Sequence, residues 1–100
     1  MVVYLNSNYE VILKESYEIH MVSSRQIRAA RALLGWSAQV LSEKSGVGSA
    51  TIKRYEVQEG IPAANTSVLM SIKSCFEEAG IEFTGDPLRN PGVTLHLSNH

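Results

Sequence analysis

The clearest pattern in the chain is a pair of short amphipathic segments within residues 38–57, AQVLSEKSGVGSATIKRYEV, separated by a Gly-Val-Gly turn. Leu41, Val47 and Ile52 are spaced so that two helices joined by a tight turn would bury them together. Gly46 predicts an abrupt end to the first helix, because glycine enters the left-handed backbone conformation without the strain of an L-residue. The pattern therefore predicts a helix-turn-helix unit.

Hydrophobic spacing predicts one helix on each side of this unit. The first spans about residues 25–34, and Ser23 followed by Gln26 has the spacing of a capping box at its start. Its apolar face consists of Ile27, Ala30 and Leu34, with Leu33 beside it. Gly35 ends it, Trp36 is expected in the core, and Ser37 is expected to cap the next helix.

The last predicted helix spans about residues 66–79, with Asn65 as its cap. Its main apolar face consists of Leu69, Ile72, Phe76 and Ala79, and Val68 and Cys75 widen it. The lone thiol of Cys75 is expected to be buried and inert. The three histidines, which lack metal-ligand spacing, are expected at the surface.

Both ends of the chain have strand-like composition. VVYL (2–5) and YEVIL (9–13), joined by Asn-Ser-Asn, predict a hairpin over residues 1–20. IEF (81–83) and VTLHL (93–97), with a turn-rich connection, predict a second hairpin over residues 81–98. The expected fold is mainly α: a four-helix helix-turn-helix domain over residues 22–80, flanked by short terminal β-hairpins.

Residues 22–80 resemble the XRE family of helix-turn-helix regulators, which includes phage repressors and Cro-like proteins. The similarity lies in RAARALLGWS (28–37), LSEKSGV (41–47), SATIKRYE (49–56) and EEAG (77–80). Two positions depart from the family pattern. Ser42 replaces the usual alanine at the helix contact, and Ser45 replaces an apolar residue.

The resemblance implies that the helix opening at Ser49 enters the major groove of double-stranded DNA. The residues implied to face the bases are Gly48, Ser49, Ala50, Lys53 and Arg54. Those implied to lie at the phosphate backbone are Ser37, Ala38 and Gln39. Lys53 or Arg54 could instead contact only phosphate, and Gln39 could be a plain surface residue. Lys44 and Arg28 are weaker candidates for phosphate contact. Arg31 and Glu56 are implied to form a structural ion pair.

The net charge of the chain is only −1, which does not by itself indicate a DNA-binding protein. The distribution of charge along the chain does support this interpretation. Residues 24–55 hold six cations against Glu43 alone, a surplus of five. The rest of the chain holds three cations against nine acids, a deficit of six. Clustered positive charge on the motif is the electrostatic footprint of a nucleic-acid binder, although a helical surface rich in lysine and arginine would look similar.

Composition limits the classes of protein to which the chain can belong. The chain has no apolar run long enough to span a membrane and no secretion signal, and its single cysteine fits a reducing compartment, so a cytoplasmic protein is expected. No residue pattern indicates an enzyme, a metal site or a cofactor. One hundred residues leave no room for a separate effector domain.

These features predict a bacterial or phage transcriptional repressor that blocks polymerase sterically. A homodimer is expected, joined through the terminal strands VVYL and VTLHL or through the helix over residues 66–79. The alternative is a protein-interaction module, such as an antitoxin that holds a toxin or a coactivator that bridges transcription factors. The salt dependence of DNA binding distinguishes the two.

Overall fold

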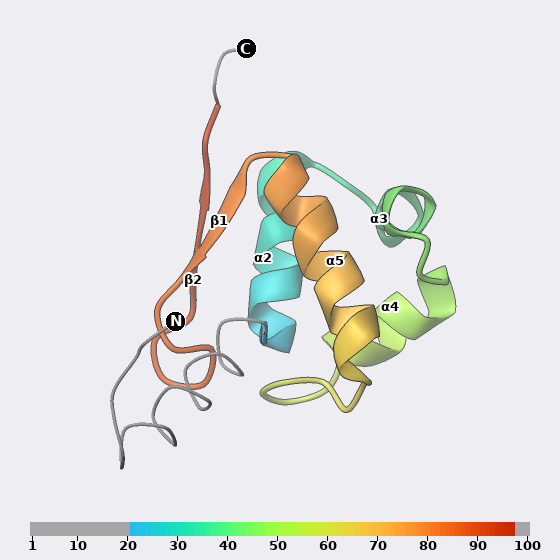
Figure 1. Cartoon of the computed structure of the whole chain (residues 1–100), viewed down its shortest axis with the longest axis horizontal. Coiled ribbons are helices and arrows are strands. Elements are labelled where there is room, and N and C mark those ends of the chain that lie inside the picture. The colour runs from blue at the N-terminus through green and yellow to red at the C-terminus, as the bar shows by residue number, and fades with distance from the viewer. Residues whose placement is uncertain (1–20, 98–100) are drawn as a thin grey trace, which may run out of the picture.

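Four helices and a two-stranded hairpin make up residues 21–97, the part of the chain that the computed structural model describes (Figure 1). The elements are α2 (Ser24–Leu34), α3 (Ala38–Ser45), α4 (Ser49–Glu56), α5 (Thr66–Glu78), β1 (Ile81–Thr84) and β2 (Gly92–Leu95). The predicted mainly α fold with a terminal hairpin is confirmed. The hairpin predicted over residues 1–20 lies outside the described residues.

The helices begin at the residues that their capping chemistry selects. At α2 the Ser23 hydroxyl accepts from the Gln26 amide at 3.2 Å, and the Gln26 side-chain oxygen accepts from the Ser23 amide at 3.0 Å. This is the reciprocal capping box that the sequence predicts. Ser37 and Asn65 cap α3 and α5 by accepting from the amide three residues later. All three predicted caps are confirmed.

Glycine ends the first two helices. Gly35 and Gly46 follow α2 and α3 with φ of 70° and 80°, in the left-handed region. An added Cβ would meet no atom within 4 Å at Gly46, so backbone conformation alone requires glycine there. The turn that places α4 against α3 therefore depends on this residue type.

The inner faces of the helices meet in one core. Its fully buried apolar members, exposed by 1% or less, are Val22, Ile27, Ala30, Leu41, Ile52, Leu69, Ile72 and Phe76. Trp36 is half-buried and its ring lies 5.9 Å from that of Phe76, which also meets Phe83 edge-on at 6.0 Å. The expected place of Trp36 against the core is confirmed.

Two apolar side chains of the helices are more exposed than the others, and for Cys75 the expected burial is wrong. Leu33 is 46% exposed, because it lies seven residues after Gln26 on the side of α2 that faces the hairpin, away from the other helices. Cys75 is only half-buried, because it lies at the edge of the α5 face near Lys44 and Glu78.

The hairpin packs against the helices through one of its two faces. β1 and β2 are antiparallel, and Ile81 pairs with Leu95 as Phe83 pairs with Val93. These four side chains belong to the core or pack on it, whereas Glu82, Thr84 and Thr94 on the other face are exposed. β2 ends at Leu95, two residues before the end of the predicted strand.

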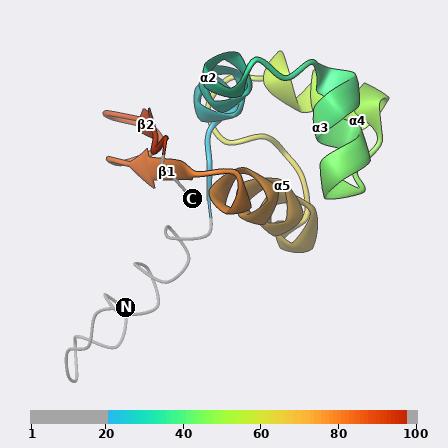
Figure 2. The ribbon, with the colours of Figure 1, turned by 90° about the horizontal axis from the view of Figure 1, so that it is seen from above.

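Gln26 joins α2 to the hairpin. Its side-chain nitrogen donates to the carbonyl oxygens of Thr84 at 3.3 Å and Gly92 at 3.1 Å. The capping box holds the amide oxygen of Gln26 on Ser23, so the nitrogen is directed to the strands. Figure 2 shows the result: the hairpin lies at one end of the molecule, α3 and α4 at the other, and α2 and α5 between them.

Candidate nucleic-acid interface

The pairing of α3 with α4 decides which side of α4 reaches solvent. Leu41 on α3 and Ile52 on α4 are both fully buried, Tyr55 is 5% exposed, and Val47 in the turn packs against the core. These contacts fix the inner face of α4. Its opposite face is therefore open, at the end of the molecule farthest from the hairpin (Figures 1 and 2).

The open face of α4 carries the predicted groove residues. Ala50, Lys53 and Arg54 are exposed, and Ser49 is half-buried at the first position of the helix. The Arg54 guanidinium lies 5.6 Å from the Tyr55 ring centre, a cation–π distance that orders the side chain without covering it. The face combines a hydroxyl, a methyl and two cations, which suit base edges and phosphates.

Gly48 precedes α4 and provides no side-chain acceptor for the first amides of the helix. Thr51, in the same first turn, is half-buried with its hydroxyl about 4.0 Å from the position of a Cβ on Gly48. The sequence interpretation omitted Thr51. Its place in the first turn, beside two predicted contact residues, is the signal that could have included it.

The start of α3 offers fewer free side chains than the sequence suggests. Ser37 is exposed, and its oxygen caps the Val40 amide at 3.1 Å. Ala38 is 8% exposed, so only its main chain can meet a ligand. Gln39 is exposed, and its amide nitrogen donates to Glu43 at 3.3 Å. An anion at this helix start would be held mainly by backbone amides.

Arg31 and Glu56 form the predicted ion pair. Arg31 Nε and Nη2 each donate to one Glu56 carboxylate oxygen at 2.7 Å. Nη1 donates to the Trp36 carbonyl at 2.9 Å. The hydrogen bonds that Arg31 donates to the Glu56 carboxylate raise the pKa of Arg31 above its usual value. The pair is largely buried, so it fixes the end of α4 on α2 and is not available to DNA.

Two more side chains of α2 hold the end of α4. The Ser24 hydroxyl donates to the Tyr55 carbonyl at 2.7 Å, and Arg28 Nη1 donates to the Glu56 carbonyl. Both satisfy carbonyls that a helix end leaves without partners. Arg28, considered at the sequence level as a phosphate contact, therefore has a structural role.

Several cations of the motif do not lie on the open face of α4. Arg31 is neutralised by Glu56, and Lys44 lies 5.3 Å from the Trp36 ring centre. The cations on the open face of α4 are Lys53 and Arg54. The local charge of the face is therefore smaller than the surplus counted along the sequence.

This arrangement agrees with a comparison against protein families. Residues 27–72 match the family described as helix-turn-helix. These residues are a helix-turn-helix domain of the XRE family. This match supports a DNA-binding helix-turn-helix regulator. Neither the curated proteins nor the solved structures contain a significant match to the chain.

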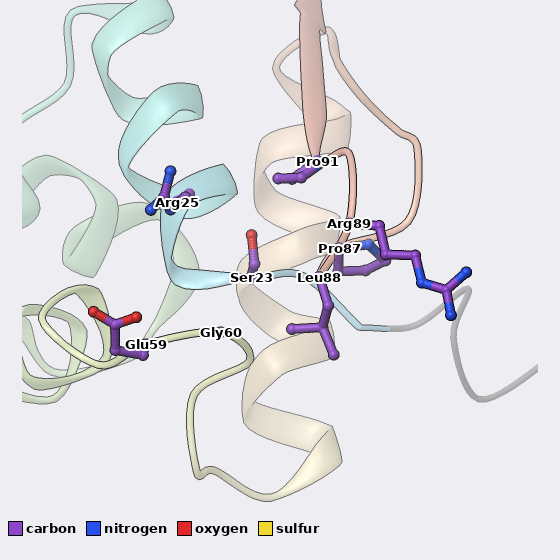
Figure 3. Close-up of a pocket in the computed structure, with 8 residues that line it drawn as sticks. All are labelled: Ser23, Arg25, Glu59, Gly60, Pro87, Leu88, Arg89 and Pro91. Atoms are coloured by element: carbon purple, nitrogen blue, oxygen red, sulfur yellow. The ribbon is translucent and has the colours of Figure 1, made fainter.

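A cleft of about 420 Å³ lies between the start of α2 and the hairpin loop (Figure 3). Leu88 reaches into it against Gly60, where an added Cβ would lie 3.2 Å from its methyl carbon. Arg25, Glu59 and Arg89 line the cleft, but they lie apart and do not converge on one point (Figure 3). The cleft therefore lacks the focused charge of an anion site.

A smaller hollow exposes one side of Cys75, beside Trp36, Lys44 and Glu78. Desolvation is the main cause that raises the pKa of the Cys75 thiol, and the Glu78 carboxylate adds to it. The thiol therefore stays protonated at neutral pH. No helix among residues 21–97 is long and apolar enough to cross a membrane.

Proposed function

We propose that this protein is a sequence-specific transcriptional repressor that inserts α4 into the major groove of double-stranded DNA. The proposal rests on the observation that α4 has one buried face and one exposed face. Ile52, Tyr55 and Glu56 anchor one side to the scaffold, and Ala50, Lys53 and Arg54 leave the other side open. Such a face can be presented to DNA without unfolding any part of the domain.

In this proposal the first turn of α4 reads bases. Ser49 and Thr51 can donate or accept, and Ala50 can contact a thymine methyl group. Arg54 can reach guanine O6 and N7, a contact worth about 1–3 kcal/mol of discrimination. Gly48 allows close approach of the backbone to the duplex, because it has no side chain.

The backbone amides at the start of α3, with Ser37 and Gln39, would contact phosphate. Such contacts fix the register of α4 without reading sequence. Repression would follow from steric exclusion of polymerase. A homodimer would double the small site that one domain reads, with half-sites about 34–36 Å apart.

Fluorescence anisotropy with a DNA site selected from a random pool tests the proposal. We expect Arg54→Ala to weaken binding to the selected site by about 1–3 kcal/mol, with a smaller effect on unrelated DNA. Arg89→Ala is the matched control: it removes the same charge from an exposed residue in the loop between β1 and β2, and the hairpin and α4 lie at opposite ends of the described structure (Figure 2). Equal losses in the two variants would show that Arg54 contributes only general charge.

Salt dependence separates the repressor from the protein-interaction alternative. The logarithm of the binding constant should fall with the logarithm of salt concentration with a slope of about −0.9 per neutralised phosphate. An antitoxin or coactivator module without DNA function would give no specific binding at any salt concentration.

A further inference from the structure

An exposed apolar side chain lies at the far end of the open face of α4. Val57 directly follows the last residue of the helix and is 81% exposed. Its backbone stays in the right-handed helical region, with φ of −92° and ψ of −5°, and the Gln58 amide donates to the Tyr55 carbonyl at 3.2 Å. The helical path therefore continues through Val57, and its side chain keeps the direction of a helical residue.

The position of Val57 around the helix axis is close to the middle of the open face. It follows Ala50 by seven residues, which is about two turns of helix, so the two side chains lie on the same side. Lys53 and Arg54, both exposed, lie three and four residues after Ala50 and flank the line between Ala50 and Val57. The open face thus presents a methyl group, two cations and an isopropyl group.

The buried side of α4 holds this end of the helix in place. The Ser24 hydroxyl donates to the Tyr55 carbonyl, and the Arg28 guanidinium donates to the Glu56 carbonyl. Both bonds come from α2 and fix the two residues before Val57. Val57 is therefore presented on a backbone that is held from behind, and a ligand on the open face meets it without rearrangement of the domain.

The charges around Val57 favour a nucleic acid over an apolar protein surface. The two acids nearest to it in the sequence are directed elsewhere: Glu56 is 6% exposed and accepts from Arg31, and Glu59 lines the cleft at the start of α2 (Figure 3). The charges that flank Val57 on the open face are those of Lys53 and Arg54. Cations suit a phosphate-rich ligand, whereas the centre of an interface between proteins is depleted of lysine.

Thymine is the base that such a side chain can recognise. Its edge carries a methyl group in the major groove, and apolar side chains contact that methyl group. The groove is about 12 Å wide, and α4, with 8 residues, is about 12 Å long, so both ends of the helix fit in it. Ala50 and Val57 are about 10.5 Å apart along the helix axis, which matches the rise of about three base pairs.

We propose that Val57 is a specificity-determining residue that contacts the methyl group of a thymine, at most about three base pairs from the base that Ala50 meets. The inference rests on the proposed DNA function and adds a statement about the site. Each half-site contains two thymines whose methyl groups contribute to binding, one beside each end of α4. Lys53 and Arg54 contact guanine or phosphate between them.

Replacement of single thymines by uracil tests the contact, because uracil lacks only the C5 methyl group and keeps the base pair. The probe is the duplex that the wild-type protein selects from a random pool, with each thymine of a half-site replaced in turn. At the Val57 position we expect the replacement to weaken wild-type binding by about fourfold, the effect of one buried methyl group. Fluorescence anisotropy measures each dissociation constant.

Val57→Ala completes the comparison. The variant should bind the all-thymine duplex about fourfold or more weakly than the wild type. It should be insensitive to uracil at the Val57 position and remain sensitive at the Ala50 position. Because Val57 is exposed, its melting temperature should change by no more than about 4 °C.

Leu88→Ala is the matched control. It truncates a 64% exposed apolar side chain in the loop between β1 and β2, and the hairpin lies at the opposite end of the described structure from α4 (Figure 2). This variant should keep the full sensitivity of the wild type to uracil at both positions.

Three results would overturn the role of Val57. The first is a duplex in which each uracil costs the wild-type protein and Val57→Ala the same factor. The second is a Val57→Ala variant that binds the selected duplex as tightly as the wild type. The third is an equal loss of affinity for selected and unrelated duplexes, because Val57 would then contact only the sugar-phosphate backbone. In all three the selected duplex still exists, so the proposed function stands; a pool without enrichment would refute the proposed function and this inference together.

Discussion

Replacing Arg31 with methionine tests the ion pair that holds α4 in place. Arg31→Met keeps most of the apolar stem but removes all three donated hydrogen bonds, two to Glu56 and one to the Trp36 carbonyl. The Glu56 side chain is 7% exposed, so its carboxylate would remain buried with its main partner gone. We expect a large loss of stability and a small direct effect on the face that meets DNA.

The size of the loss follows from this burial. Removing one partner of a buried pair costs about 3–5 kcal/mol. Arg31 itself is 23% exposed, so solvent compensates part of the loss and the lower end of that range applies. For a domain of this size, 1 kcal/mol shifts the melting temperature by about 4–8 °C. A decrease of about 12 °C or more is therefore expected for Arg31→Met.

Thermal unfolding followed by circular dichroism measures the shift, and DNA affinity is measured well below the new melting temperature. The double variant Arg31→Met, Glu56→Leu is the control: it removes the stranded charge, so it should be more stable than Arg31→Met alone. A melting temperature changed by less than about 2 °C, together with lost DNA binding, would refute the structural role of the pair.

Three further predictions concern the scaffold. Gly46→Ala should cost about 1 kcal/mol in unfolding free energy, whereas Gly48→Ala, at a φ of −59°, should cost less; equal costs would contradict the turn argument. Gln26→Leu should cost about 1–3 kcal/mol because it removes the hydrogen bonds that the Gln26 side chain donates to the Thr84 and Gly92 carbonyls, and chemical denaturation measures it. Because the pKa of Cys75 is raised, its alkylation by iodoacetamide at pH 8 should be slower than that of an unfolded chain and should accelerate at higher pH; equal rates would contradict the desolvation argument.

Much of the helical part could be predicted because its signals are local. A capping box involves residues three positions apart, and a left-handed helix end requires one glycine, so Ser23, Asn65 and Gly46 could each be interpreted from their neighbours. The inner faces of α3 and α4 follow from the spacing of Leu41 and Ile52. Arg31 and Glu56 were paired through family resemblance, and the structure confirms that pair.

Contacts between distant segments could not be predicted. Gln26 has the spacing of a capping residue, and nothing in that spacing indicates that its nitrogen reaches strands 58 and 66 residues away. Leu33 was placed beside the apolar face of its helix, and its exposure could not be predicted, because periodicity gives the apolar side of a helix but not the width that neighbours cover. Arg28 was a candidate for phosphate, since a sequence does not show that the end of α4 lies within its reach.

The central claim is that the open face of α4 reads DNA sequence, and selection of bound duplexes from a random pool tests it most directly. The account predicts enrichment of a two-fold symmetric site, and loss of that enrichment when Ser49 and Arg54 are replaced together by glutamate and alanine. A pool that shows no enrichment with the folded wild-type protein, or the same enriched site with the double variant, would contradict it.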